Sequence, residues 1–194
     1  MSVFHNNVLA GAAGQAGGAA AAADVATRSL RFNKPDSAHL NRTPSSAGNR
    51  RTWTISVWCK KTANGLSMPL IQANNSANPY LNLVFTTADK IRWLDGGARG
   101  QCLTDAVFRD NSAWYHIVCA TDTTLSTATD RVKIYVNGVR QDVTFPTAVT
   151  SNLQTEVNNT TEHRIGRWRS NVNNYLNGYL ADYYLIDGSA LAPT

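Results

Sequence analysis

The chain has 194 residues, which suits one domain with a short extension, and 43% of its residues are hydrophobic. Its five Trp, seven Tyr and five Phe indicate a folded globular protein and exclude a disordered one. It has no run of about 18 apolar residues, so we predict no membrane span. The net charge is +5, and residues 28–61 hold eight Lys and Arg against one acid. Because these charges are scattered and not clustered with aromatic residues, we predict a solvated face and no nucleic-acid partner.

Residues 1–27 form a separate compositional unit, rich in Ala and Gly and without charge from residue 8 to residue 23. The segment has neither the basic start nor the Leu-rich centre of a signal peptide. Alone it buries too little surface to offset its chain entropy, so we predict an extended arm that docks against another copy or a partner. A flexible leader is the alternative. The docking residues that we predict are Phe4, Val8, Leu9, Gly11, Gly14, Gly17 and Gly18.

From residue 28 onward, short apolar segments alternate with turn signals, which is typical of β-strands. The closing strand is expected between an Asn177-Gly178 turn and an Asp187-Gly188 turn, with apolar residues on both of its faces. No segment shows a convincing helical period. We therefore predict an all-β domain over residues 28–194, an antiparallel sandwich or jelly roll. The other predicted strands are 29–32, 53–60, 68–72, 80–86, 90–94, 114–120, 131–136, 139–143 and 162–167.

The three cysteines, Cys59, Cys102 and Cys119, share no short spacing. An odd number of cysteines without metal-ligand spacing argues against both a disulfide framework and a zinc site. We predict that they are reduced and mostly buried, as free cysteines usually are. That state fits a protein made and assembled in a reducing cytoplasm.

Four motifs occur in the order found in one known superfamily: 53–58 (WTISVW), 114–118 (WYHIV), 132–138 (VKIYVNG) and 177–188 (NGYLADYYLIDG). Together they resemble strands of the concanavalin A-like lectin/glucanase superfamily, in particular its laminin-G and pentraxin-like branch. The resemblance covers about residues 28–190 and implies a two-sheet jelly-roll sandwich.

The closing motif, followed by Leu191-Ala192-Pro193, is most similar to laminin-G-like domains on structural proteins of tailed bacteriophages. This resemblance implies a virion protein (capsid decoration, fibre or tail-associated) that is assembled in the host cytoplasm. Its partners would be other virion proteins and further copies of itself, contacted through the arm, with host glycans at the exposed sandwich. A free-standing carbohydrate-binding module is the alternative, and a glycoside hydrolase is less favoured.

The acidic residues of this chain do not match the catalytic carboxylates of the superfamily's enzymes. Glucanases of this superfamily carry Glu-x-Asp-x-x-Glu on one strand, because hydrolysis needs two carboxylates at a fixed separation. This chain has only Glu156 and Glu162, without an Asp at the central position. Its four His are dispersed, and no Ser-His-Asp or Cys-His arrangement is recognisable. We predict that the protein is not an enzyme.

Calcium is the one cofactor that the resemblance suggests, since relatives in this branch often bind Ca²⁺ at a loop rim through Asp carboxylates and carbonyl oxygens. Asp122 and Asp130 stand at the two ends of the loop after the 114–120 strand and are the candidate ligands.

Glycan binding requires an exposed aromatic ring beside groups that hydrogen-bond sugar hydroxyls. The best such stretch holds Trp168 with Arg167, Arg169, Asn173 and Tyr175. The alternative is that Trp168 simply packs on the rim of the sandwich.

Overall fold

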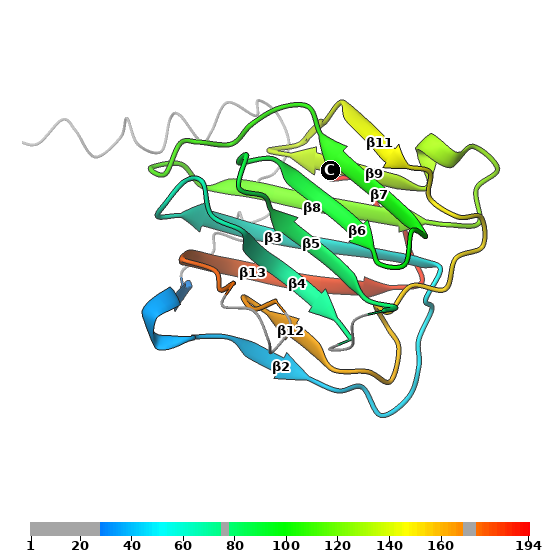
Figure 1. Ribbon diagram of the computed structural model, residues 1–194, viewed down its shortest axis with the longest axis horizontal. Helices are drawn as coiled ribbons and strands as arrows, with labels where there is room; N and C mark the ends of the chain where they lie inside the picture. Colours follow the sequence, from blue (N-terminus) through cyan, green and yellow to red (C-terminus); the bar gives the residue numbers. More distant parts are fainter. Residues whose placement is uncertain (1–27, 75–77, 169–173) are drawn as a thin grey trace, which may run out of the picture.

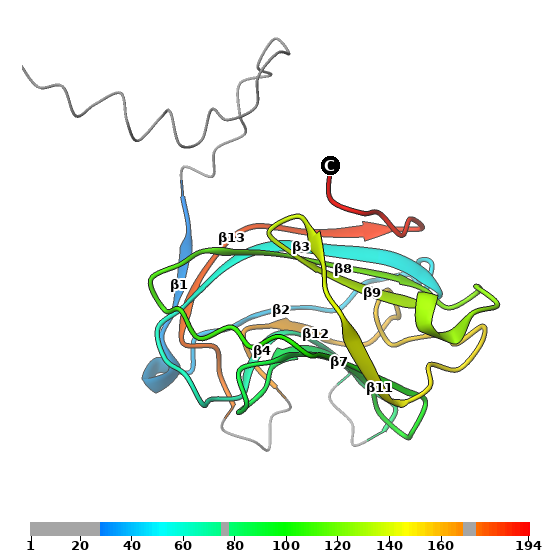
Figure 2. The same ribbon diagram turned by 90° about the horizontal axis from the view of Figure 1, so that it is seen from above.

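The protein is a sandwich of two antiparallel β-sheets, shown by a computed structural model that describes residues 28–74, 78–168 and 174–194. Figure 2 shows the two layers edge-on. The helical structure among the described residues is limited to two short 3₁₀ helices, Lys34–Asp36 and Ala128–Asp130. The prediction of an all-β, concanavalin A-like sandwich is confirmed. Residues 1–27, with the predicted docking residues Phe4, Val8, Leu9, Gly11, Gly14, Gly17 and Gly18, lie outside the described part.

Sheet A has six strands in the order β1-β13-β3-β8-β9-β10. The long central strand β3 hydrogen-bonds over most of its length to β13 on one side and to β8 on the other. In spatial order the strands are Leu30–Phe32 (β1), Gly178–Asp187 (β13), Thr52–Lys61 (β3), Tyr115–Asp122 (β8), Val132–Val136 (β9) and Val139–Arg140 (β10).

Sheet B has seven strands in the order β11-β7-β6-β5-β4-β12-β2 and lies in front of sheet A in Figure 1. In spatial order they are Val143–Thr147 (β11), Gly100–Thr104 (β7), Ile91–Asp95 (β6), Leu81–Phe85 (β5), Met68–Ala73 (β4), His163–Ile165 (β12) and Leu40–Arg42 (β2).

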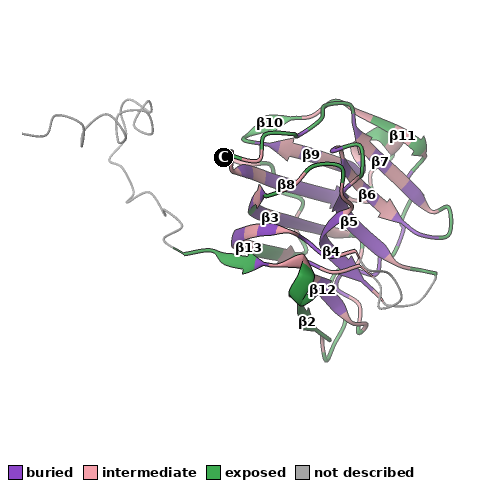
Figure 3. Ribbon diagram, turned by 60° about the vertical axis from the view of Figure 1, so that its left-hand side comes forward, coloured by how far each residue is buried: buried purple, intermediate pink, exposed green. Residues whose placement is uncertain are grey.

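The core forms between the sheets from alternate residues of each strand. Trp53, Ile55 and Val57 of β3 face it, and all three are fully buried. Trp93 of β6 and Phe85 of β5 meet them from sheet B and are also fully buried. Figure 3 shows the central strands largely buried, whereas β2 and β10 at the margins are exposed. Cysteines 59, 102 and 119 are buried and unpaired, as predicted.

Gly178 does not form the turn that the Asn-Gly dipeptide predicted. It is the first residue of β13 and pairs with Phe32 on one side and Lys61 on the other. A Cβ atom at this position would collide with the carbonyl oxygen of Lys60. The glycine is therefore required by close strand approach, not by turn geometry.

A β-bulge divides β13 between Ala181 and Tyr184, and Asp182 within it has a φ of 46°. The bulge puts one extra residue into β13, so it reverses the alternation of side chains beyond it. Leu180 and Leu185 consequently lie on the same, core-facing side. Regular alternation along this strand, without the bulge, would instead place Leu180 on the same face as Tyr184.

The chain beyond β13 crosses the outer face of sheet A. The Thr54 hydroxyl donates to the Ser189 carbonyl oxygen at 2.7 Å and accepts a hydrogen bond from the Leu191 N–H at 2.8 Å. Figure 2 shows this C-terminal segment on the side of sheet A that faces away from sheet B. No helix in the described residues has the length and apolar character needed to cross a membrane.

Candidate functional site

The outer face of sheet B carries polar side chains that are withdrawn from solvent. Leu81 and Leu83 of β5 face the core, so Asn82 between them faces outward. The strand register places Gln72 of β4 and Leu94 of β6 on either side of Asn82. Asn82 and Gln72 are nevertheless fully buried. Another part of the chain must therefore cover this side of the sheet.

The described ends of the connection between β12 and β13 bring Trp168 to this face. Arg167 and Tyr175 form an isolated antiparallel bridge, and the Trp168 N–H donates to the Asn174 carbonyl oxygen at 3.0 Å. The Arg92 guanidinium of β6 lies over the Trp168 ring, 5.4 Å from the ring centroid. This contact holds a partly exposed Trp against the outside of the sheet.

Several buried polar atoms of Trp168 and of the outer face of sheet B have no hydrogen-bond partner among the described residues. They are both amide atoms of Asn82, Oε1 of Gln72, Nε of Arg92 and Nε1 of Trp168. Each buried polar group left unpaired costs about 1 to 3 kcal/mol. The set combines donors, acceptors and one aromatic ring. A polyhydroxylated ligand matches it, since each hydroxyl both donates and accepts and the ring offers a stacking surface.

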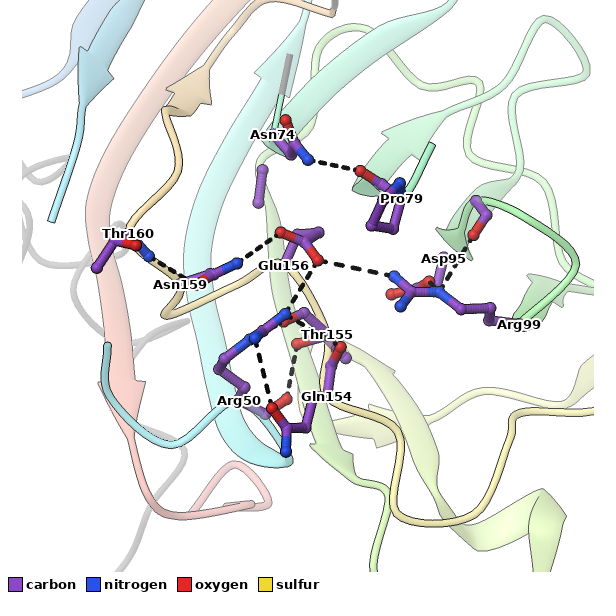
Figure 4. Close-up of polar contacts among 12 residues, drawn as sticks. Arg50, Asn74, Pro79, Asp95, Arg99, Gln154, Thr155, Glu156, Asn159 and Thr160 are labelled. Carbon is purple, nitrogen blue, oxygen red and sulfur yellow. Dashed lines mark hydrogen bonds and ion pairs between the residues drawn. The ribbon is translucent and has the colours of Figure 1, made fainter. Parts of the chain in front are cut away.

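A second polar group, an arginine–carboxylate cluster, closes one end of the sandwich (Figure 4). Arg50 Nη2 lies 3.0 Å from Glu156 Oε1, and Arg99 Nε donates to Asp95 Oδ1 at 2.5 Å. Arg99 also approaches Glu156 at 3.9 Å. Burial raises the pKa of Asp95 to about 7, although the charge of Arg99 opposes the shift. Because each carboxylate faces an arginine, the cluster acts as a clamp that ties the 154–159 loop to the ends of β3 and β6.

A buried lysine forms the matching clamp at the opposite ends of β3 and β6. Lys61 Nζ donates to Asp89 Oδ1 at 2.8 Å and to the Phe108 carbonyl oxygen at 2.7 Å. It also lies 4.9 Å from the centroid of the Phe85 ring. Lys61 belongs to sheet A and Asp89 to the β5–β6 turn of sheet B, so this ion pair joins the two layers.

The basic stretch 28–61 does not form one continuous patch. Lys61 is buried with Asp89, and Arg50 is paired with Glu156. Two of the eight positive charges are thus used inside the protein.

The predicted calcium ligands, Asp122 and Asp130, each have a partner within the protein. Asp122 Oδ1 accepts hydrogen bonds from the N–H and the hydroxyl of Thr124, at 3.0 and 2.6 Å. Asp130 pairs with Arg140 at 3.3 Å. In the described ranges, no three His, Cys, Asp or Glu side chains are grouped as metal ligands. Calcium at Asp122 and Asp130 stays a prediction, which titration with Ca²⁺ would check.

The predicted glycan-binding residues that the structure describes make different contacts. The Arg167 guanidinium lies 5.3 Å from the Tyr175 ring centroid, and Tyr175 is buried. These two side chains pack on each other, whereas Trp168 contacts Arg92. Arg169 and Asn173 lie outside the described residues.

Sequence reasoning missed three side chains of this face, namely Gln72, Asn82 and Arg92. The available signal was a single polar residue between two apolar residues of a strand, as Asn82 in 81–85 (LNLVF) and Arg92 in 91–95 (IRWLD). What the sequence does not show is that these three residues share one face of sheet B and that Arg92 meets Trp168 there.

An antiparallel two-sheet sandwich with an aromatic ring and unpaired polar groups on one outer face defines a lectin-like β-sandwich protein. A laminin-G-type family model, described as the concanavalin A-like lectin/glucanases superfamily, matches residues 35–193. The chain belongs to this superfamily, as the four motifs of the sequence indicated.

Solved structures show the same fold at low sequence identity. Domains LG4-5 of the mouse laminin α1 chain match 88% of this chain and 48% of their own, with 12% identity and a TM-score of 0.56. The CBM40 of a Ruminococcus gnavus sialidase, bound to α2,3-sialyllactose, matches 81% and 94%, with 11% identity and a TM-score of 0.52. A heptameric pentraxin from Limulus polyphemus matches 76% and 68%, with 12% identity and a TM-score of 0.51. This chain thus spans about half of the laminin fragment. A comparison with curated proteins found no match.

Proposed function

We propose that the protein is a non-enzymatic, lectin-like protein that binds a glycan on the outer face of sheet B. A sugar ring stacks at the partly exposed Trp168, beside the Arg92 guanidinium. Hydroxyls of the sugar reach the amides of Asn82 and Gln72 on the same face of the sheet. The CBM40 neighbour, which is bound to sialyllactose, supports the class of ligand but not its identity.

The observation that carries this proposal is Asn82. Its side-chain amide is fully buried on the outside of a sheet, and neither its oxygen nor its nitrogen has a partner among the described residues. A ligand that supplies both a donor and an acceptor removes the free-energy cost of leaving the Asn82 amide unpaired, and a sugar hydroxyl supplies both.

The test is a glycan array that includes neutral and sialylated glycans, followed by calorimetry with the best ligand. Trp168→Ala and Arg92→Ala are each expected to weaken binding by about tenfold or more, a loss of about 1.4 kcal/mol. The matched control is Trp58→Ala, a Trp on the outer face of sheet A that is 37% exposed. Absence of glycan binding by the wild-type protein, or equal loss in the Trp58 variant, would reject the proposal.

The non-enzymatic part rests on the partners of the two glutamates. Glu156 is held by Arg50 at 3.0 Å, and Glu162 by Arg164 at 2.6 Å. Both carboxylates are engaged in ion pairs with arginines. Release of sugar products during prolonged incubation with the bound glycan would contradict this.

We further propose that the lectin-like domain, residues 28–194, is carried on a bacteriophage particle through residues 1–27. The support is the similarity of residues 177–193 to laminin-G-like domains of phage structural proteins. Copies of the chain and other virion proteins are then its partners. Deleting residues 1–27 should release the protein from the particle, and continued attachment would count against a virion role for the arm.

A further inference from the structure

Arg92 of β6 points outward from sheet B, between two apolar side chains. Its neighbours along the strand, Ile91 and Trp93, are fully buried members of the core, so Arg92 lies on the opposite face. The strand register places Val84 of β5 on one side of Arg92 and Leu103 of β7 on the other. Val84 is fully buried, and Arg92 itself is partly buried. The guanidinium is therefore held in a partly apolar environment.

No carboxylate of the described residues balances the charge of Arg92. This side chain takes part in none of the ion pairs that the described residues form, and its Nε atom is buried without a hydrogen-bond partner there. Burial lowers the pKa of Arg92, because the surroundings disfavour the charged form. An arginine nevertheless stays protonated in proteins. A partly buried cation without a counter-ion is suited to receive an anionic group.

The rest of the described face leaves Arg92 without an acid. Two acids lie at its margins. Glu162 binds Arg164 at 2.6 Å, and Asp105, just beyond β7, accepts a hydrogen bond from the Thr144 hydroxyl at 2.8 Å. The other outward positions of β5, β6 and β7 are uncharged, namely Asn82, Val84, Leu94, Gln101 and Leu103. The positive charge of Arg92 is therefore available to a ligand.

The groups assigned above to glycan binding lie within reach of Arg92. The centroid of the Trp168 ring is 5.4 Å from its guanidinium carbon. Asn82 lies opposite Leu94, two positions along β6 from Arg92. Such diagonal neighbours on adjacent strands are about 7 to 8 Å apart. One sugar ring with its substituents spans this separation, so an anionic substituent can meet Arg92 while a hydroxyl meets Asn82.

We propose that the glycan bound on this face is acidic, with a carboxylate on its sugar ring that pairs with Arg92. A guanidinium binds a carboxylate through two parallel N–H···O bonds, and apolar surroundings strengthen the pair. The ring then stacks at Trp168, and its hydroxyls reach Asn82 and Gln72. Sialic acids and hexuronic acids both supply this chemistry. The inference rests on the proposed function, because it specifies the ligand of that same site.

Acidic glycans and their methyl esters test this inference, since the ester keeps the ring and the hydroxyls but loses the charge. Neutral, sialylated, uronate-containing and sulfated glycans are first compared on an array. Sialyllactose and a glucuronate-terminated disaccharide are then each compared with their methyl ester by calorimetry. We expect at least one acid to bind about tenfold or more tightly than its ester, and the acid that does so identifies the sugar.

The outcomes separate this inference from the proposed function. Equal affinity for each acid and its ester, or a preference for neutral or sulfated glycans, would overturn the inference and leave the proposed function standing. Absence of binding to every glycan would reject both.

Two arginine variants and one salt series locate the charge that the ligand meets. Arg92→Gln should weaken binding of the acid about tenfold and leave the ester nearly unchanged. The control, Arg140→Gln, removes the same charge from β10 of sheet A, where the side chain is 52% exposed, and should keep the preference for the acid. For the wild-type protein, raising NaCl from about 0.05 to 0.5 M should weaken binding of the acid more than that of the ester, because salt screens a partly exposed ion pair. An unchanged preference in Arg92→Gln, an equal loss in Arg140→Gln, or equal salt dependence of acid and ester would each overturn the inference.

Discussion

Removing the buried Lys61 ammonium should be among the most damaging single changes in this protein. Lys61 is fully buried, and its Nζ binds Asp89 at 2.8 Å and the Phe108 carbonyl oxygen at 2.7 Å. In Lys61→Met the Asp89 carboxylate keeps only the Gly65 N–H at 3.0 Å and Arg109 at 3.3 Å, whose side chain is 64% exposed. We expect the free energy of unfolding to fall by about 3 to 5 kcal/mol, because a buried charge loses its main partner.

A double-mutant cycle measures this effect. Urea unfolding, followed by tryptophan fluorescence, is compared for Lys61→Met, Asp89→Asn and the double variant. The double variant should be more stable than the sum of the single losses predicts, because neither charge is then left alone. The control is Lys60→Met, on the partly exposed neighbour, where a change within about 0.5 kcal/mol is expected. A loss under about 1 kcal/mol in Lys61→Met, or additivity in the double variant, would refute the reasoning.

The pH dependence of this pair has a definite sign. Burial alone would raise the pKa of Asp89, but hydrogen bonds from Lys61 and from the Gly65 N–H lower it below its ordinary value. A carboxyl with a lowered pKa contributes stability above about pH 4 and loses that contribution as the pH falls. The difference in stability between wild type and Lys61→Met should therefore shrink in acid.

Three further predictions concern buried groups. Because burial raises the pKa of Asp95 to about 7, the folded protein holds that proton more tightly than the unfolded chain, and the free energy of unfolding should fall as the pH rises from about 4 to 7. Asp95→Asn should remove this part of the pH profile, as measured by urea titrations. If the difference in free energy of unfolding between wild type and variant did not change with pH, the prediction would be contradicted. Gly178→Ala should lower the free energy of unfolding by about 2 kcal/mol or more, because the alanine Cβ would collide with the Lys60 carbonyl oxygen. Unaltered urea unfolding would argue against that contact. Burial raises the pKa of the Cys59 and Cys119 thiols to about 12, so both should react with a thiol reagent only after unfolding, and rapid labelling of the native protein would disprove this.

The strands with clear apolar alternation were predictable, whereas β2 and β7 were not. Residues 53–60, 114–120 and 131–136 were expected as strands and correspond to β3, β8 and β9. β2 is three exposed residues, and it is held by pairing with β12, about 120 positions further along the chain. β7 has an ordinary mixed composition and is fixed by its neighbours β6 and β11. Such strands depend on tertiary pairing, which local sequence does not encode.

The same distinction applies to the candidate site. Trp168 was recognisable as an aromatic residue among polar ones, and it does lie on a polar face. Its contact with Arg92 brings together positions far apart in the chain, through the fold of the β12–β13 connection. The bulge at Asp182 was equally invisible, because one extra residue leaves the local composition unchanged.

The C-terminal segment held by Thr54 determines how the molecule can be presented to a ligand. Because this segment lies on the outside of sheet A, a tag or a further stretch of chain after Thr194 departs from that layer. Immobilising the protein through such a tag therefore turns the Trp168 surface toward the bulk solution, where large polysaccharides can approach it without meeting the support.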